Sequence, residues 1–292
     1  MSELRIPLND GNSIPWLAFG TGTALYQKEA KDQVLQAISS GIVHLDGAQL
    51  YANEESLGDA IVQSGVAREK LYVTTKLGPV PEGKTVRDTL EESLKKLKID
   101  YVDLFLIHIP KQHADLKGVW KQLEALKKEG LAKSIGVSNF HIQDFEKILP
   151  DAEFIPAVNQ IEYHPYVFKA SKPLIDYLKS KKIVPTSYGG LSPITRHKGG
   201  PLDPVLEKIA KRLGDTRGKP VTPGQVLQVW LRQQEIPAIT TSSKLERLRE
   251  YLDVVNIPDL TAEEVKEIEE VGSKVHHRVF ATVIDTSNDP KL

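Results

Sequence analysis

Short apolar segments alternate with amphipathic segments along most of the chain, and the apolar ones have the length of buried β-strands. The expected strands are Leu17–Gly20, Val43–Asp46, Leu71–Lys76, Val102–His108, Ser134–Ser138, Ala157–Gln160, Ile183–Tyr188 and Pro237–Thr240. Parallel strands need helical crossovers between them. Strand–helix units in this number, over about 250 residues, predict the α/β class and a (β/α)8 TIM barrel, with a doubly wound open sheet as the rival.

The segments between the strands carry apolar residues at helical spacing, and several begin at a capping residue. One such face follows a predicted Thr85 cap and consists of Val86, Leu90, Leu94 and Leu97. Two elements lie outside the repeat. Arg5–Leu8 and Ser13–Trp16 flank an Asp-Gly turn and predict an N-terminal β-hairpin. Near the other end, Thr261 and Glu264 form a capping box that predicts an extra C-terminal helix.

Nothing in the sequence marks a domain boundary. The chain has no low-complexity tract and no Ser/Gly-rich linker, and its glycine- and proline-rich stretches 189–204 and 214–224 interrupt the pattern without changing the composition. We therefore expect residues 1–292 to form one barrel domain. Residues 273–292 are expected to form a polar tail that either closes over the site or is disordered.

Composition removes several classes of function. The 38 basic and 39 acidic residues give a net charge of −1, which provides no basic surface for nucleic acid or membrane. The absence of cysteine excludes disulfides, thiolate nucleophiles and cysteine-bound metals. No signal peptide, glycosylation sequon or apolar run long enough to span a bilayer is present. A soluble cytoplasmic protein is the expectation.

Four ionisable residues fall where consecutive expected strands end. Asp46, Lys76 and His108 each close a strand, and Tyr51 follows Asp46 in the next loop. In a barrel these positions surround the catalytic mouth. Taken singly, each has a simpler interpretation as a turn former, a solvated strand end, a core histidine or a packing aromatic. Together they predict one site.

The chemistry of these four residues is coherent. An ammonium beside a phenol is expected to lower the pKa of Tyr51, while Asp46 keeps Lys76 charged. Tyr51 then acts as a general acid, and His108 donates a hydrogen bond to the same substrate oxygen. No metal-ligand spacing is evident. Protonation of an oxygen without a covalent intermediate suits carbonyl reduction when a hydride source is bound nearby.

A second cluster predicts a site for that source. The last expected strand is followed by hydroxyl residues and then by Lys244 and Arg247 in the first turn of a helix, where cations oppose the helix dipole. Such a helix start suits an external phosphate, although both cations could also be merely solvated. The segment Gly20-Thr21-Gly22-Thr23 lacks the third glycine of a dinucleotide-binding turn. A nicotinamide cofactor would therefore have to lie across the barrel mouth.

With these segments in place, the chain resembles the aldo-keto reductase family over nearly its whole length. The matching motifs are His44–Glu54, Thr75-Lys76, Asp100–His108, Gly136–Phe140 and Asn159–Glu162. The resemblance implies the tetrad Asp46, Tyr51, Lys76 and His108, with Tyr51 as proton donor. It also implies that Ser138, Asn139 and Gln160 hold the nicotinamide carboxamide, that Tyr188 stacks on the ring and that Leu191 lines the pyrophosphate channel. The full expected cofactor-binding set is Gly22, Thr23, Asp46, Ser138, Asn139, Gln160, Tyr188, Leu191, Thr241, Ser242, Ser243, Lys244 and Arg247.

The sequence departs from the common family pattern at three places. Thr241 stands where many relatives have a lysine that contacts the 2′-phosphate of NADPH, and Lys244 beside Arg247 is expected to take over that contact. Gly22 stands where many have tryptophan, which predicts a wider or differently shaped substrate mouth. Gly189-Gly190 replaces a common Ser-Pro in the loop that clasps the cofactor.

The form of the 240–244 segment resembles fungal α-keto amide and conjugated polyketone reductases. The resemblance therefore implies an NADPH-dependent reductase of aldehydes and activated ketones such as α-keto amides and cyclic α-diketones. The expected partner is a small carbonyl compound, and a monomer is the family habit. A polyol dehydrogenase or aldose reductase using the same tetrad is the nearer alternative. A non-catalytic binding or structural barrel is the more distant one.

Overall fold

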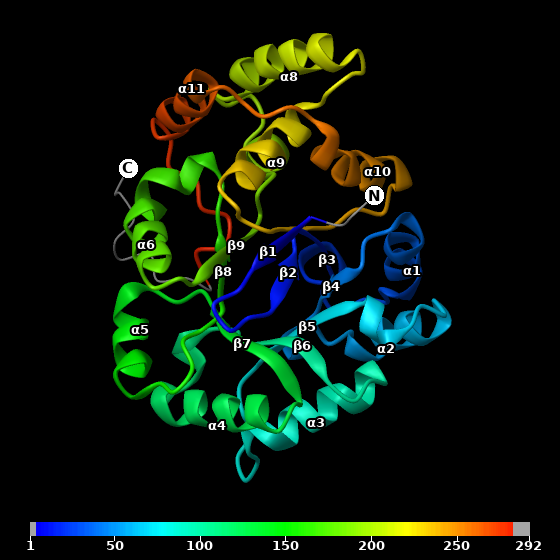
Figure 1. Ribbon diagram of the computed structural model, residues 1–292, viewed down its shortest axis with the longest axis vertical. Coiled ribbons are helices and arrows are strands. Elements are labelled where there is room, and N and C mark those ends of the chain that lie inside the picture. The colour runs from blue at the N-terminus through cyan, green and yellow to red at the C-terminus, as the bar shows by residue number, and fades with distance from the viewer. Residues whose placement is uncertain (1–3, 283–292) are drawn as a thin grey trace.

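The computed structural model describes residues 4–282, and its centre is a closed barrel of parallel strands (Figure 1). The barrel strands are β3 Leu17–Gly20, β4 His44–Asp46, β5 Tyr72–Leu77, β6 Val102–Ile107, β7 Ala132–Ser138, β8 Val158–Glu162, β9 Val184–Tyr188 and β10 Ala238–Thr240. They follow one another in chain order, and β10 pairs with β3 to close the ring. The predicted barrel is confirmed, and the open sheet is excluded.

Helices cover the outside of the barrel and bury the apolar faces that the sequence pattern indicated. They are α1 Lys31–Ser40, α2 Glu54–Gln63, α3 Val86–Leu97, α4 Leu116–Lys128, α5 Ile142–Ile148, α6 Phe168–Ser180, α9 Pro223–Gln233 and α10 Leu245–Asp253. Helix α3 begins as predicted, because the Thr85 hydroxyl accepts from the Asp88 backbone at 3.2 Å and the Asp88 carboxylate accepts from the Thr85 backbone at 2.7 Å. Such reciprocal bonds satisfy two of the amide groups that a helix start leaves without partners.

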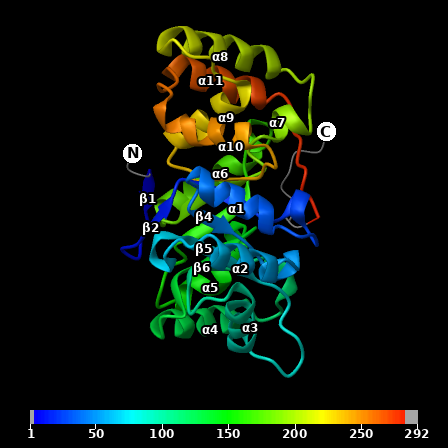
Figure 2. The same ribbon diagram turned by 90° about the vertical axis from the view of Figure 1, so that its right-hand side faces the viewer.

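The predicted N-terminal hairpin closes the end of the barrel at which the strands begin. Strands β1 Arg5–Pro7 and β2 Ser13–Pro15 pair antiparallel, with Ile6 opposite Ile14. The side-chain amide of Asn9 donates to the Pro156 carbonyl at 2.9 Å, just before β8. Figure 2 shows this hairpin on the left of the barrel and the end of the described chain on the right. The barrel is therefore covered at the end opposite the carboxyl ends of its strands.

Three further helices lie outside the repeat: α7 Ser192–Thr195, α8 Asp203–Arg217 and α11 Ala262–Gly272. Helix α11 begins at the predicted Thr261 capping box. Helix α8 was not predicted, and the interpretation of residues 214–217 as an interruption is wrong, since Gly214 lies inside this helix. Helices α8 and α11 lie side by side (Figure 1), and Lys208 of α8 bonds Glu267 of α11 at 2.8 Å.

The interior of the barrel is packed, and the ionised side chains on its inner face lie near the carboxyl ends of the strands. Leu104 and Leu106 are buried within it, since they pair with Thr74 and Lys76 and so share the face of Lys76. Asp46, Lys76 and Glu162 are also buried, and each lies at or next to the last residue of its strand. Within residues 4–282, no helix is both long enough and apolar enough to cross a membrane. The fold thus places these three buried charges at one end of the barrel, as barrel enzymes do.

Two glycines inside helices give a matched test of this packing. A Cβ at Gly58 of α2 would overlap the Lys96 carbonyl oxygen and lie 2.7 Å from the Leu97 carbonyl carbon, whereas one at Gly214 of α8 would meet only ordinary contacts from 3.5 Å. We expect Gly58→Ala to lower the free energy of unfolding by about 1–3 kcal/mol through overpacking. Gly214→Ala should instead raise it by up to about 1 kcal/mol through helix propensity.

Urea unfolding followed by circular dichroism measures both changes. A gain in stability from Gly58→Ala would contradict the close contact between α2 and the end of α3.

Candidate active site

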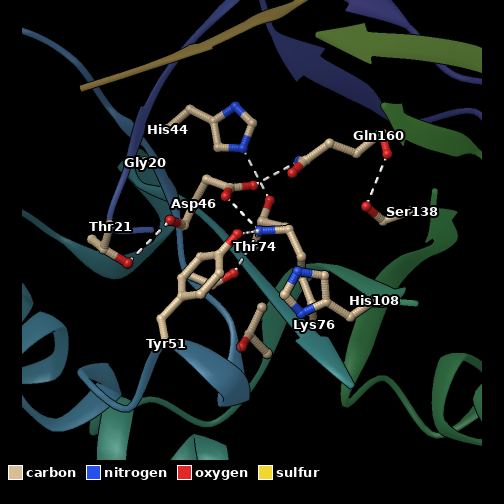
Figure 3. Close-up of polar contacts among 12 residues, drawn as sticks. Gly20, Thr21, His44, Asp46, Tyr51, Thr74, Lys76, His108, Ser138 and Gln160 are labelled. Atoms are coloured by element: carbon tan, nitrogen blue, oxygen red, sulfur yellow. Dashed lines mark hydrogen bonds and ion pairs between the residues drawn. The ribbon is translucent and has the colours of Figure 1, made fainter. Parts of the chain in front are cut away.

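The structure brings the four predicted catalytic side chains together at the carboxyl ends of β4, β5 and β6 (Figure 3). Lys76 lies at the centre, and its ammonium donates to Asp46 Oδ1 at 2.5 Å, to the Gly47 carbonyl at 2.8 Å and to the Tyr51 hydroxyl at 3.3 Å. Tyr51 ends the short 3-10 helix η2 Gln49–Tyr51. These three acceptors account for all the protons of the ammonium.

Burial makes the Lys76–Asp46 ion pair sensitive to its surroundings. The side chain of Lys76 is 0% exposed and that of Asp46 is 2% exposed. Burial alone lowers the pKa of Lys76, but the Asp46 carboxylate and the Tyr51 hydroxyl oppose it, and the net pKa lies above its ordinary value. Lys76 is therefore an ammonium at neutral pH, as the sequence predicted.

A lowered pKa for Tyr51 was predicted from the sequence, and this prediction was wrong. Burial raises the pKa of Tyr51, and this effect outweighs the lowering by the Lys76 ammonium, so the net pKa lies above 10. The reason is that a phenolate loses its hydration in this pocket, and one cation shared with Asp46 does not replace it. Tyr51 consequently keeps its proton at neutral pH, which a general acid requires.

His108 is neutral in this site. Burial, with a smaller contribution from Lys76, lowers the pKa of His108 to about 3. Its ring meets the Tyr51 ring edge to face, with 5.4 Å between the centroids. Its buried Nδ1 has no hydrogen-bond partner among the described residues. A neutral imidazole carries one N–H group. Beside the phenol, it is able to donate a hydrogen bond to an oxygen bound at Tyr51 while adding no net charge to the site.

A cavity of about 910 Å³ opens over these residues. Asp46, Tyr51 and His108 line it, while Lys76 lies behind them. The other expected residues that line it are Gly22, Thr23, Ser138, Asn139, Gln160, Tyr188, Leu191, Thr241 and Arg247. Ser242, Ser243 and Lys244 are not among its lining residues. Most of the expected cofactor-binding set therefore meets in one space.

A cluster of amide and hydroxyl groups connects the ion pair to Tyr188. Gln160 donates to Asp46 Oδ2 at 2.8 Å, and the Ser138 hydroxyl donates to the Gln160 carbonyl at 2.8 Å (Figure 3). The Asn139 amide donates to Ser138 Oγ at 3.1 Å and accepts from the Tyr188 hydroxyl at 2.7 Å. Asn139 has a φ of +61°, in the left-handed region that asparagine tolerates better than most residues. A planar amide such as a carboxamide fits this donor and acceptor set.

Two of the hydroxyls before α10 bond groups within the protein. The Thr241 hydroxyl donates to the Gly20 carbonyl, and the Ser242 hydroxyl accepts from the Lys244 backbone at 3.0 Å. Both groups therefore stabilise the turn into the helix. Lys244 is the N-cap and lines neither cavity, whereas Arg247 lines the main cavity and also a second cavity of about 510 Å³ beside it. Both residues are exposed. Of the two expected cations, Arg247 is the one that faces the cavities.

The backbone at Gly22 lies close to Tyr51, and this contact shapes the mouth of the cavity. A Cβ at Gly22 would lie 2.8 Å from Cζ of Tyr51, so the backbone packs directly against the Tyr51 ring. The glycine permits this close approach. The space that a tryptophan would need at this position is partly filled by Tyr51 itself.

Sequence reasoning missed several side chains that line the main cavity. They are Tyr26, Leu50, Ile109, Gln112, Arg196, Tyr251 and Phe280. Ile109 could have been found, because it follows His108 at a strand end. Phe280 could not, because the tail has no periodicity that indicates where its side chains point.

With this geometry established, comparison with known proteins identifies the family. The model of the aldo/keto reductase family matches residues 16–273, and the chain belongs to that family. The predicted enzyme class, an oxidoreductase of this family, is confirmed.

The chain is also similar to individual members along most of its length. It is 36% identical to the NAD/NADP-dependent indole-3-acetaldehyde reductase of Schizosaccharomyces pombe, over 94% of this chain and 98% of that protein. It is 33% identical to the NADPH-dependent alpha-keto amide reductase of Saccharomyces cerevisiae, over 91% and 89%. A crystal structure of an aldo/keto reductase from Brucella melitensis is 32% identical, with a TM-score of 0.80, covering 92% of this chain and 100% of that one. The predicted nicotinamide cofactor agrees with the names of both fungal relatives.

Proposed function

We propose that this protein uses NADPH to reduce aldehydes and activated ketones, including α-keto amides and cyclic α-diketones, to alcohols. The observation that carries the proposal is a protonated Tyr51 phenol, held by the buried Lys76–Asp46 pair, beside a neutral His108 on the wall of a large cavity. This arrangement is able to protonate an oxygen. Carbonyl reduction needs that proton transfer and does not need a covalent intermediate with the protein.

Each residue of the tetrad has a distinct task. NADPH supplies the hydride when it is bound. Tyr51 gives its proton to the carbonyl oxygen, and the Lys76 ammonium stabilises the phenolate left behind. Asp46 keeps Lys76 charged and in place. His108 orients the carbonyl oxygen through a hydrogen bond from its neutral ring.

The cofactor site follows the groups that line the cavity. Ser138, Asn139 and Gln160 would hold the carboxamide, and Tyr188 offers a ring face for the nicotinamide. Leu191 lines both cavities and would border the pyrophosphate. Arg247, at the boundary of the two cavities, would hold the 2′-phosphate, since a guanidinium binds phosphate through two parallel hydrogen bonds.

The substrate end of the cavity favours carbonyl compounds with an apolar body. Tyr26 and His108 flank Tyr51, with ring centroids 6.4 Å and 5.4 Å away. Leu50, Ile109 and Phe280 add apolar surface, and Gln112 offers a polar group. A sugar or polyol would lose hydrogen bonds to water here and regain few, which argues against the polyol dehydrogenase alternative. A non-catalytic barrel has no physical need for a buried ion pair aimed at a phenol.

The experiment that tests this function is a substrate panel. NADPH oxidation is followed with an aryl acetaldehyde, an α-keto amide, a cyclic α-diketone and an aldose, with NADH in parallel. We expect turnover of the first three and a kcat/KM for the aldose lower by at least about tenfold, because each hydroxyl without a partner costs about 1 kcal/mol or more. Fastest turnover on the aldose would contradict the proposed substrate class.

Replacing Tyr51 by phenylalanine tests the acid. The variant keeps the ring that packs on Gly22 and loses only the hydroxyl. We expect kcat to fall by at least about 100-fold, because general acid catalysis is lost, with little change in NADPH affinity measured by fluorescence quenching. Turnover at the wild-type rate would remove Tyr51 from this role.

Replacing Arg247 by alanine tests whether this residue binds the 2′-phosphate of NADPH. A charge-assisted contact contributes about 1.5–3 kcal/mol, so the Kd for NADPH should rise by about tenfold or more and the Kd for NADH much less. Lys244→Ala is the matched control, because Lys244 is a nearby exposed cation like Arg247 but does not line either cavity. An equal loss of affinity for NADPH and NADH, or a larger loss of NADPH affinity from Lys244→Ala, would show that Arg247 does not bind this phosphate.

A further inference from the structure

A buried carboxylate that the tetrad does not use lies at the end of β8. Glu162 is 0% exposed and is the last residue of that strand. Its Oε1 accepts from the Val279 backbone at 2.7 Å, and its Oε2 accepts from the Phe280 backbone at 3.1 Å. His164 Nε2 lies 3.1 Å from Oε1, and the Arg278 guanidinium lies 3.8 Å from Oε2. One side chain of the barrel thus binds the C-terminal segment through both of its oxygens.

These contacts suit an ionised carboxylate. Burial alone raises the pKa of Glu162, but the His164 and backbone donors more than offset it, and the net pKa lies below its ordinary value. Two consecutive backbone N–H groups need two acceptor atoms, and a carboxylate offers both. A carboxamide of the same shape offers one acceptor and turns an N–H₂ group toward the other backbone donor.

The segment held by Glu162 reaches both the substrate wall and the loop after β9. The Phe280 ring meets the Tyr188 ring edge to face at 5.2 Å and lines the main cavity. The His277 ring lies 4.7 Å from the His197 ring of that loop. Figure 2 shows this part of the chain passing down the side of the molecule opposite the hairpin.

The strand that carries Glu162 also carries a residue of the site. Gln160 lies two positions earlier on β8, so the two side chains point to the same face of the strand. Gln160 bonds Asp46 in the tetrad, whereas Glu162 bonds the C-terminal segment. One strand therefore contacts both the Lys76–Asp46 ion pair, through Gln160, and the segment that carries Phe280, through Glu162. The register of β8 fixes the distance between the two.

We propose that Glu162 is a positioning residue, which holds Phe280 against Tyr188 through the backbone of residues 279 and 280 and so sets the affinity for substrates with an apolar body. The inference rests on the proposed function, because it assigns Phe280 to the substrate wall. Glu162 acts through the C-terminal segment and takes no part in the proton transfer.

The test is a double-mutant cycle of Glu162→Gln and Phe280→Ala, assayed with the aryl acetaldehyde. Each single variant should raise KM by about tenfold, the loss expected when an aromatic wall is removed, while kcat stays near the wild-type value. If Glu162 acts through Phe280, the double variant should match Phe280→Ala alone. Additive effects on KM would overturn the proposal.

Limited digestion with trypsin gives a readout that does not depend on activity. Arg278 is 7% exposed in its side chain, so cleavage after it requires release of the segment. We expect faster cleavage in Glu162→Gln and near wild-type cleavage in Phe280→Ala, which keeps the carboxylate contacts. An unchanged rate in Glu162→Gln would overturn the anchoring role.

A second variant protects the test against misfolding. Val279→Pro removes the N–H donor to Glu162 without changing the barrel, and it should reproduce the KM increase of Glu162→Gln. Its tryptic pattern is not compared, because trypsin does not cleave the Arg–Pro bond that this variant creates after Arg278. Wild-type inactivity toward every carbonyl compound would overturn the proposed function, whereas the tryptic comparison tests the anchor alone.

Discussion

A lysine ammonium and an aspartate carboxylate, both removed from water, impose the strictest demand on this fold. Their attraction offsets the cost of burying two charges only when every remaining proton and lone pair is also satisfied. The register of the barrel meets that demand. Asp46 pairs with Thr74 across β4 and β5, so Lys76, two residues further on, points to the same face as Thr74. Gly47 and Tyr51 accept the other ammonium protons, and Gln160 reaches Asp46 from β8.

The same demand explains why the site extends across half of the barrel. Gln160 is fixed by Asp46, Ser138 donates to the Gln160 backbone, and Asn139 connects Ser138 to Tyr188. A displacement of β8 would therefore disturb the ion pair and the amide cluster at once. Buried polar networks of this kind give a unique arrangement when all of their members are satisfied. The chemistry proposed for Tyr51 requires that arrangement, because it needs the ion pair and the cavity wall together.

Much of this could be predicted from the sequence, because it depends on local order. The barrel follows from the alternation of strand and helix patterns, and Asp46, Lys76 and His108 converge because the carboxyl ends of parallel strands meet. The pKa direction of Tyr51 could not be predicted, since it depends on how deeply the phenol is buried. Helix α8 was missed because Gly214 inside it resembles a breaker. The roles proposed for Glu162 and Phe280 depend on a contact across 118 residues, which no local pattern encodes.

The enclosure of Lys76 also has a consequence for its own reactivity. An amine attacks acylating reagents through the lone pair of its neutral form, but this one is protonated, donates to three oxygens and has 0% of its side chain exposed. Lysines on the surface would be labelled within the folded molecule. Lys76 would be labelled only when the strands around it separate, so the rate of its acylation would measure how often the barrel opens.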